Sequence, residues 1–294
     1  MRISTKWNTW LTAYLMILPL IGLLTVFAVI PFLYAWYVSF SDWSFYDPWK
    51  FVGLKNYRQV LLDPKFTKSV IVGLKFSLYV VPASLILAFL FGHSMRHLRG
   101  KSADFVKTSI YIPTIMSGVI ASIIFLFIYE YQGGFLNYAV GLLGGDKIAW
   151  LSNTKTVLIA IAVPAIWLGF GLTALIMLAG LLDIPESYYE AAELEGAGSF
   201  TKMFKITLPL MKNVILFLLV LGFNGSIQEL VLPMVMTQGG PLEESQTPSL
   251  YIFNHFRDDI LMGNTIASAI LLFIVCGSVA AVLFRLVNSE KAAD

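Results

Sequence analysis

The chain has 294 residues, of which 57% are hydrophobic and only 13% are charged, and its mean hydropathy is +0.76. Soluble domains carry about 25% charged residues, so this chain cannot cover its apolar surface with charge, and an ordinary soluble enzyme is excluded. The formal net charge of +2 gives no electrostatic basis for binding nucleic acid. The composition therefore indicates an integral membrane protein.

Membrane-spanning helices need about 20 mostly apolar residues. Six stretches meet this requirement, and each is apolar on all sides, which favours membrane helices over amphipathic surface helices. In chain order they are Leu11–Tyr37, Ser69–Phe91, Thr108–Tyr129, Thr156–Leu182, Asn213–Met236 and Thr265–Val287. Prolines interrupt the first five of these stretches, and a proline inside a membrane helix kinks it. We therefore predict an all-α membrane protein with six transmembrane helices.

The expected organisation is a cytoplasmic tail at residues 1–10, a transmembrane domain at residues 11–287 and a second cytoplasmic tail at residues 288–294. The first span is too long for the core of a signal peptide, so we expect it to remain in the protein. Six spans place both termini on one side. The basic turn His93–Lys107 indicates a cytoplasmic loop, but the longer Lys50–Lys75 segment is also basic, so charge favours this orientation without deciding it.

The segment between the fourth and fifth spans, residues 183–212, is predicted to form two short helices. Pro185 near the beginning of the segment is a helix start signal, and Gly196 at the end of the first predicted helix is a helix stop signal. Helical spacing places three acidic residues on one polar stripe: Glu186, Glu190 and Glu193. An interfacial helix lying on lipid is the alternative, but the inner leaflet is itself negative. The acidic stripe therefore favours docking to a protein partner.

This segment resembles the "EAA" signature of binding-protein-dependent ABC importer permeases. The matching pattern is Glu190-Ala191-Ala192, three residues, Gly196, nine residues, and then Ile206-x-Leu208-Pro209. Further stretches resemble the carbohydrate-uptake branch in its maltose-type first-permease form: Phe51–Tyr57, Ile112-Pro113, Trp167-Leu168-Gly169 and Thr237-x-Gly239-Gly240-Pro241. The resemblance extends over nearly the whole chain, and its long motif is more specific than the short ones.

The resemblance implies the permease subunit of a bacterial ABC importer for a sugar or oligosaccharide, in the inner membrane with both termini in the cytoplasm. It implies a heterodimer with a second permease, two copies of an ABC ATPase and an extracytoplasmic substrate-binding protein. Residues 183–212, here called the coupling segment, would dock on the ATPase through Glu190, Ala191, Ala192, Gly196, Ile206, Leu208 and Pro209. These residues would be mechanical rather than catalytic, with Glu190 pairing with a basic group or a backbone donor of the ATPase.

The chain contains no G-x-x-x-x-G-K-[ST] loop that could hold ATP phosphates. We therefore expect no cofactor bound by this chain and no catalytic residue, with ATP and Mg²⁺ used by the partner ATPase. A single cysteine, Cys276, and three scattered histidines give no expectation of a metal site.

Polar groups inside membrane spans are costly and usually face a cavity. The fifth span carries several of them, and the resemblance places the substrate site of the maltose-type relatives in spans three, four and five. Together the candidates are Thr114, Gly118, Leu168, Gly169, Leu172, Asn224, Gly225, Ser226, Gln228 and Glu229. Several differ from the aromatic and asparagine side chains of the relatives, so we expect either a substrate other than maltose or a small contribution from this half. Polar contacts between helices are the alternative explanation.

Three other functions fit the sequence less well than a sugar permease does. A permease for glycerol-phosphate belongs to the same branch, but a phosphate ligand favours basic cavity residues, and spans three to six offer none. A stand-alone ion-coupled secondary transporter would usually show internal repeats around a midplane site, and no convincing repeat is found. An intramembrane enzyme would need a motif such as H-E-x-x-H or G-x-S-x-G, and neither is present.

Overall fold

The computed structural model describes residues 3–44, 49–96, 98, 100–258 and 262–288, with the side chains of those between residues 10 and 286. The chain divides into two units, Met1–Asp63 with Asn254–Leu271, and Pro64–Phe253 with Leu272–Asp294. The described residues form helices and one isolated β-bridge, so the expected all-α class is confirmed. Residues 1–2 and 289–294 of the two expected tails, and Arg99 in the basic turn, lie outside the described residues.

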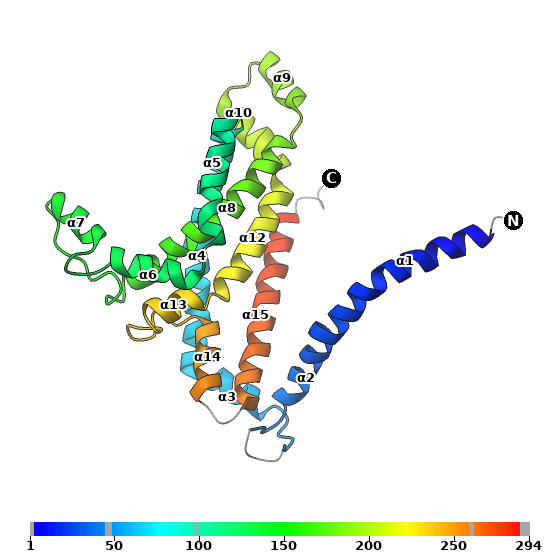
Figure 1. The fold of residues 1–294 in the computed structure, drawn as a ribbon, viewed down its shortest axis with the longest axis vertical. Helices are drawn as coiled ribbons and strands as arrows, with labels where there is room; N and C mark the ends of the chain where they lie inside the picture. The colour runs from blue at the N-terminus through cyan, green and yellow to red at the C-terminus, as the bar shows by residue number, and fades with distance from the viewer. Residues whose placement is uncertain (1–2, 45–48, 97, 99, 259–261, 289–294) are drawn as a thin grey trace. The chain divides into compact units, whose positions relative to one another are not determined.

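In the first unit, one long apolar helix begins the chain. It consists of α1 (Ile3–Leu24), a single π-helical turn (Thr25–Val29) and α2 (Ile30–Ser39) (Figure 1). Pro31 cannot donate the helical bond to the carbonyl of Phe27, and a π-turn next to such a position absorbs the missing bond. The most apolar window of the span Trp10–Ser39 is 0% buried within the chain, so its side chains require lipid or another subunit around them.

The loop after this helix is held by the Phe51–Tyr57 motif. Asn56, the second residue of α3 (Lys55–Leu62), is buried and donates hydrogen bonds to the carbonyls of Ser39 and Ser41, at 2.9 and 2.8 Å. The hydroxyls of Tyr57 and Ser39 lie 2.6 Å apart. Gly53 turns the chain with a φ of 58°, a conformation that glycine adopts without steric cost. The motif therefore satisfies the carbonyls that the end of α2 leaves open.

In the second unit, α8 (Val157–Leu182) and α12 (Lys212–Ile227) pack against α4 (Pro64–Met95) (Figure 1). The core that joins α4 and α8 includes Phe76 and Ile161, whose side chains are 1% and 0% exposed. Burying a side chain of this size contributes about 1.5–3 kcal/mol. Gly92 of α4 permits close contact, since a Cβ there would lie 2.9 Å from Leu181. The described second half of α15 (Met262–Asn288) belongs to this unit and packs through Leu272 and Cys276 against Ile227.

The third expected span, Thr108–Tyr129, is a broken helix. α5 (Lys101–Tyr111) runs into a short 3₁₀ turn (Ile112–Ile115), and α6 (Gly118–Ile128) leaves it at 96°. Pro113 is the second residue of the 3₁₀ turn, and Ser117 then takes an extended conformation and accepts a hydrogen bond from the amide of Val119 as the cap of α6. A proline that removes one helical bond and a serine that caps a new helix together favour a break over a kink.

The fifth expected span, Asn213–Met236, also consists of two helices, α12 and α13 (Val231–Met236), separated at residues 228–230. Pro233 has no N–H to donate to the carbonyl of Glu229. That carbonyl instead accepts a 2.6 Å hydrogen bond from the hydroxyl of Thr247, and the Glu229 carboxylate accepts one from the amide of Leu232 at 3.1 Å. The break is therefore stabilised by groups that replace the lost helical bonds.

The two broken spans meet, because α6 packs against α13. Gly118 at the start of α6 allows this approach, with a Cβ position 3.2 Å from Val231. Beyond α13, the loop to α14 (Pro248–Asp258) is tied to the beginning of α4 by ion pairs of 3.2 Å each, Lys65–Glu243 and Lys68–Glu244. These pairs lie at the surface and add little stability individually.

Five of the described helices, or helix pairs, are long and apolar enough to cross a membrane, and the bent pair can supply a sixth crossing. The five are Trp10–Ser39, Pro64–Met95, Val157–Leu182, Lys212–Met236 and Met262–Leu286, and the pair is Lys101–Ile115 with Gly118–Ile128. All six expected spans thus have a counterpart, and the third and fifth differ from the expectation in being discontinuous.

The hairpin between α6 and α8 contains α7 (Phe135–Leu142) and is organised by one buried asparagine. The amide nitrogen of Asn137 donates to the carbonyls of Tyr131 and Ile148, at 3.2 and 3.0 Å. Its oxygen accepts from the amide of Ile148 and from the indole of Trp150, each at 3.0 Å. All four hydrogen-bonding sites of the side chain are therefore used inside the hairpin.

Replacing this asparagine with alanine is expected to destabilise the protein by about 1–3 kcal/mol, because the partner groups lose their hydrogen bonds while partly buried. For a chain of this size the melting temperature in detergent should fall by roughly 3–10 °C. Size-exclusion chromatography of heated samples measures the change. Asn153→Ala removes one exposed local hydrogen bond and is the matched control, and equal melting temperatures for the two variants would contradict the assignment.

Candidate functional site

The coupling segment begins with α9 (Glu186–Leu194), which ends in a Schellman motif. The amide of Gly196 donates to the carbonyl of Glu193 at 2.9 Å, and the amide of Ala197 donates to that of Ala192 at 2.8 Å. Gly196 has a φ of 77°, which suits glycine at this position of the motif. A side chain here would be strained, so Gly196 determines where α9 ends and where the chain turns.

After this turn the expected second helix is present as a helical stretch that is continuous from Ser199 to Leu210, and a turn at Met211 separates it from α12. α10 (Ser199–Lys202), a π-turn (Met203–Thr207) and α11 (Leu208–Leu210) follow one another and lead into α12. Ile206 and Leu208 are half-buried and Pro209 is exposed. These three motif residues therefore lie in the lead to the fifth span, whereas Glu190, Ala191 and Ala192 lie on α9.

The three carboxylates of the acidic stripe on α9 differ in whether they have a partner. Glu186 pairs with Arg96 at 3.0 Å, and Glu193 pairs with Lys202 at 2.6 Å. The hydrogen bond from Lys202 lowers the pKa of Glu193. Glu190 is exposed, and within the described residues its carboxylate makes no hydrogen bond or ion pair. Of the three carboxylates, Glu190 is the one left available to an external partner.

The coupling segment also exposes large apolar side chains. Leu194 is 92% exposed, Phe200 is 78% exposed and Phe204 is 59% exposed. Ala191 is exposed and Ala192 is half-buried. A surface that combines small residues, large exposed apolar side chains and a free carboxylate has the composition expected of a protein-docking site.

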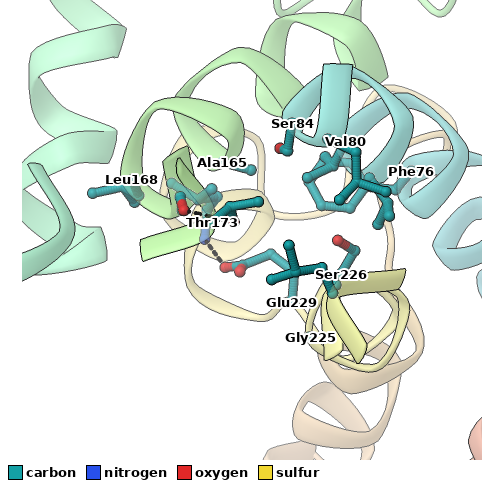
Figure 2. A pocket seen from close by; sticks show the side chains of 15 residues that line it. Phe76, Val80, Ser84, Ala165, Leu168, Thr173, Gly225, Ser226 and Glu229 are labelled. Atoms are coloured by element: carbon teal, nitrogen blue, oxygen red, sulfur yellow. Dashed lines mark hydrogen bonds between the residues drawn. The ribbon is translucent and has the colours of Figure 1, made fainter. Parts of the chain in front are cut away.

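A second feature is a cavity of about 330 Å³ between α4, α8 and the α12–α13 break (Figure 2). This volume lies within the ~300–1,000 Å³ range of ligand pockets. Its lining residues are Phe76, Val80, Val81, Ser84, Leu85, Ala165, Leu168, Gly169, Thr173, Leu218, Gly222, Gly225, Ser226, Glu229 and Leu232.

Half of the substrate-pathway candidates line this cavity: Leu168, Gly169, Gly225, Ser226 and Glu229. The others lie elsewhere. Thr114 faces Gly171 of α8, and Gly118 faces Val231. Leu172 is 42% exposed, Gln228 is exposed and donates to the carbonyl of Asn224, and the half-buried Asn224 does not line the cavity. These five residues therefore do not line this cavity, and their role in the substrate pathway stays a prediction.

The reason for the difference is the pair of breaks. The 3₁₀ turn holds Thr114 against α8, and the bend at Met116 carries α6 away from α12. At the other break, Gln228 follows the last residue of α12, so its side chain leaves the helical face that a continuous span would present. A face that is assigned from continuous helical spacing therefore does not hold beyond the point where the helix ends.

The cavity also contains polar residues that the sequence pattern missed, Ser84 of α4 and Thr173 of α8. The sequence did contain a signal for Ser84, because Ser77 and Ser84 are seven residues apart and therefore form a polar face on the second span. Thr173 donates to the carbonyl of Gly169 at 3.0 Å. Within the described residues, the hydroxyls of Ser84 and Ser226 make no hydrogen bond, so both can bind a polar ligand.

Glu229 supplies the cavity's charge. Its carboxylate accepts the hydrogen bond from the amide of Leu232 at the start of α13, a position where backbone N–H groups favour negative charge. Among the described residues that line the cavity, Glu229 is the only charged one. The arrangement of one carboxylate and several hydroxyls on a largely apolar wall can accept and donate hydrogen bonds to a polyhydroxylated ligand.

The chain is similar to known transport proteins along most of its length. Residues 76–291 match the family model described as "Binding-protein-dependent transport system inner membrane component". The sulfoquinovosyl glycerol transport system permease protein of Agrobacterium fabrum is 30% identical, over 97% of this chain and 95% of that protein. The trehalose/maltose transport system permease protein MalF of Thermococcus litoralis is 32% identical, over 83% of each chain.

A similar fold is found in a solved structure, a bacterial ABC transporter involved in the import of the acidic polysaccharide alginate. The TM-score is 0.79, with 18% sequence identity and coverage of 100% of both chains. The matched family region includes both the coupling segment and the cavity.

Proposed function

Because the chain belongs to the family of binding-protein-dependent transport system inner membrane components, and is a transport permease rather than an enzyme, we propose that it is one of two permease subunits of an ATP-driven importer for a sugar or oligosaccharide. The observation that carries the proposal is the family match over residues 76–291, which includes the coupling segment and the cavity in one chain.

We expect three kinds of partner subunit for such a permease. A second, homologous permease would complete the pathway, and two ATPase subunits would bind and hydrolyse ATP with Mg²⁺. A substrate-binding protein would deliver the sugar from outside. ATP binding can drive the permeases between two conformations only if it favours one of them, so the ATPases must contact a part of the permease that differs between the two states.

The exposed face of the coupling segment is the contact we assign to the ATPase. Its free carboxylate, Glu190, and its exposed apolar side chains, including Leu194 and Phe200, are available for docking. Since ATP is cytoplasmic, the segment lies on the cytoplasmic side. With six crossings, both termini then also lie in the cytoplasm.

The cavity is the substrate pathway of this half of the importer. Ser84 and Ser226 offer hydroxyls with free hydrogen-bonding capacity, and Glu229 offers a carboxylate. No basic residue stands among the described residues that line the cavity. A carboxylate in such a low-dielectric site repels anionic ligands, which favours an uncharged sugar over glycerol-phosphate or an acidic saccharide. Trehalose and maltose, named for one relative, belong to the favoured class.

The transport test uses the complete complex purified from its native membrane and rebuilt in proteoliposomes with ATP and Mg²⁺ enclosed. Labelled maltose, trehalose and other neutral sugars are supplied outside, together with the binding protein. We expect uptake of a neutral sugar that requires enclosed ATP. Uptake that continues without ATP and follows an ion gradient would instead indicate a secondary transporter.

The cavity assignment is tested by filling the cavity. Gly225 lines it, and a Cβ at this position would meet no atom within 4 Å. The Gly225→Phe variant should therefore fold, and its phenyl ring should project into the pathway. We expect uptake to fall by at least ~10-fold, since a barrier only about 1.4 kcal/mol higher is sufficient for that effect. Gly277→Phe on α15 also has open space and does not line the cavity. It is the matched control, and equal uptake by both variants would exclude this cavity as the pathway.

A further inference from the structure

The inner face of the coupling segment contains a three-part junction centred on Tyr189. The guanidinium carbon of Arg96, which follows the last residue of α4, lies 4.1 Å from the centre of the Tyr189 ring. The same guanidinium pairs with Glu186 at 3.0 Å, and its side chain is only 9% exposed. Arg96 therefore contacts α9 at two points one helical turn apart.

The other side of Tyr189 reaches the lead to the fifth span. Its hydroxyl lies 2.9 Å from the hydroxyl of Thr207, at the end of the π-turn before α11. Tyr189 is 9% exposed and Thr207 is 5% exposed. The apolar core around the ring includes Leu181 of α8 and Met211 at the beginning of α12. Tyr189 thus joins the end of α4 to the beginning of α12.

Both of these helices reach the cavity. Phe76, Val80 and Ser84 line it from α4, and Leu218 and Gly225 line it from α12. α4 is continuous from Pro64 to Met95, so a displacement of its inner end is carried toward the cavity by a rigid element. The face of α9 that carries Glu190 takes no part in the junction, since Glu190 is exposed.

We propose that Arg96 is a positioning residue that transmits the movement of α9 to α4 and α12, through its stack on Tyr189 and its pair with Glu186. The proposal rests on the proposed function, because it assumes that an ATPase moves α9. Arginine suits this role, since one planar guanidinium can both stack on a ring and bind a carboxylate. Lysine keeps the charge but cannot provide the planar stack.

Loss of transmission has a measurable signature that differs from loss of folding or of docking. In Arg96→Ala the exposed face of the coupling segment is unchanged, so the ATPases should remain bound and should hydrolyse ATP at no less than about half of the wild-type rate. The amount of sugar imported per ATP hydrolysed should fall at least ~10-fold, a size typical of a lost allosteric coupling. Arg96→Lys should give an intermediate ratio.

The experiment measures subunit content, ATP hydrolysis and sugar uptake on the same proteoliposomes. Lys101→Ala removes an exposed cation from the same turn of the chain and is the control, with an expected ratio equal to wild type. If Arg96→Ala does not fold, Tyr189→Phe keeps the ring and removes only the hydroxyl that contacts Thr207. That variant should lower the ratio at least ~3-fold while the ATPases stay bound.

The outcomes separate this proposal from the proposed function. If wild-type complexes contain no ATPase, the importer assignment itself is wrong. If the wild type couples hydrolysis to uptake and both Arg96→Ala and Tyr189→Phe keep its ratio, the transmission role is wrong. Loss of the ATPases from a folded Arg96→Ala complex would also overturn it, because Arg96 would then act in docking.

Discussion

Reversing the charge of Glu190 is expected to release the ATPase subunits from the purified complex. This carboxylate is exposed and lacks a partner among the described residues, whereas Glu186 and Glu193 are already paired. A lysine in its place would face the basic group or backbone donor proposed on the ATPase. Loss of such a contact and the added repulsion cost about 2–5 kcal/mol, and 2 kcal/mol already weakens binding roughly 30-fold.

The measurement is mass spectrometry of the proteins that co-purify with the tagged chain in mild detergent, comparing wild type with Glu190→Lys. Recovery of a second permease and an ATPase with the wild type, and loss of the ATPase from the variant, is the expected result. Glu195→Lys makes the same charge change at an exposed position directly after the last residue of α9. An ATPase that stays equally bound to all three proteins would contradict the docking role of Glu190.

Introducing a side chain at Gly171 is expected to have the largest effect on folding. A Cβ at this buried position of α8 would lie 2.6 Å from the carbonyl oxygen of Ile110, 2.6 Å from the hydroxyl of Thr114 and 2.9 Å from the Cα of Tyr111. Two of these atoms belong to the backbone, so they cannot move aside by changing a rotamer. Overpacking typically costs about 1–3 kcal/mol and occasionally more, and Gly171→Val should exceed the middle of that range.

The melting temperature of the purified protein in detergent should fall for Gly171→Val by roughly 5 °C or more. Gly169→Val is the matched control, because it changes the same helix two residues earlier and its Cβ would meet no atom within 4 Å. Similar melting temperatures for the two variants would show that α8 does not pack against α5 and the 3₁₀ turn as described.

The positions of the membrane helices were largely predictable from the sequence. A bilayer requires long apolar segments with satisfied backbones, and α4, α8 and α15 contain the corresponding expected spans almost entirely. The start and stop signals around α9 were equally local, since Pro185 precedes its first residue and Gly196 takes the positive φ that ends it.

The breaks in the third and fifth spans were not predictable from the prolines alone. Pro82 and Pro164 lie within the continuous helices α4 and α8, whereas Pro113 and Pro233 accompany breaks. The outcome depends on whether other groups satisfy the freed backbone. The carbonyl of Glu229, which Pro233 leaves free, is satisfied by the hydroxyl of Thr247, 18 residues further along the chain, and local sequence does not report that contact.

What the sequence by itself determined were the properties that depend on composition and short spacing: a membrane protein, its apolar segments, the motif of the coupling segment and the polar character of the fifth span. The tertiary structure decided which carboxylate of α9 is free, because the partner of Glu186 is Arg96, which directly follows α4 and lies 90 residues away along the chain. It also decided that five of the ten candidate residues share a cavity. The physical reason is the same in both cases, since long-range packing and hydrogen bonds select where helices stop and which side chains meet.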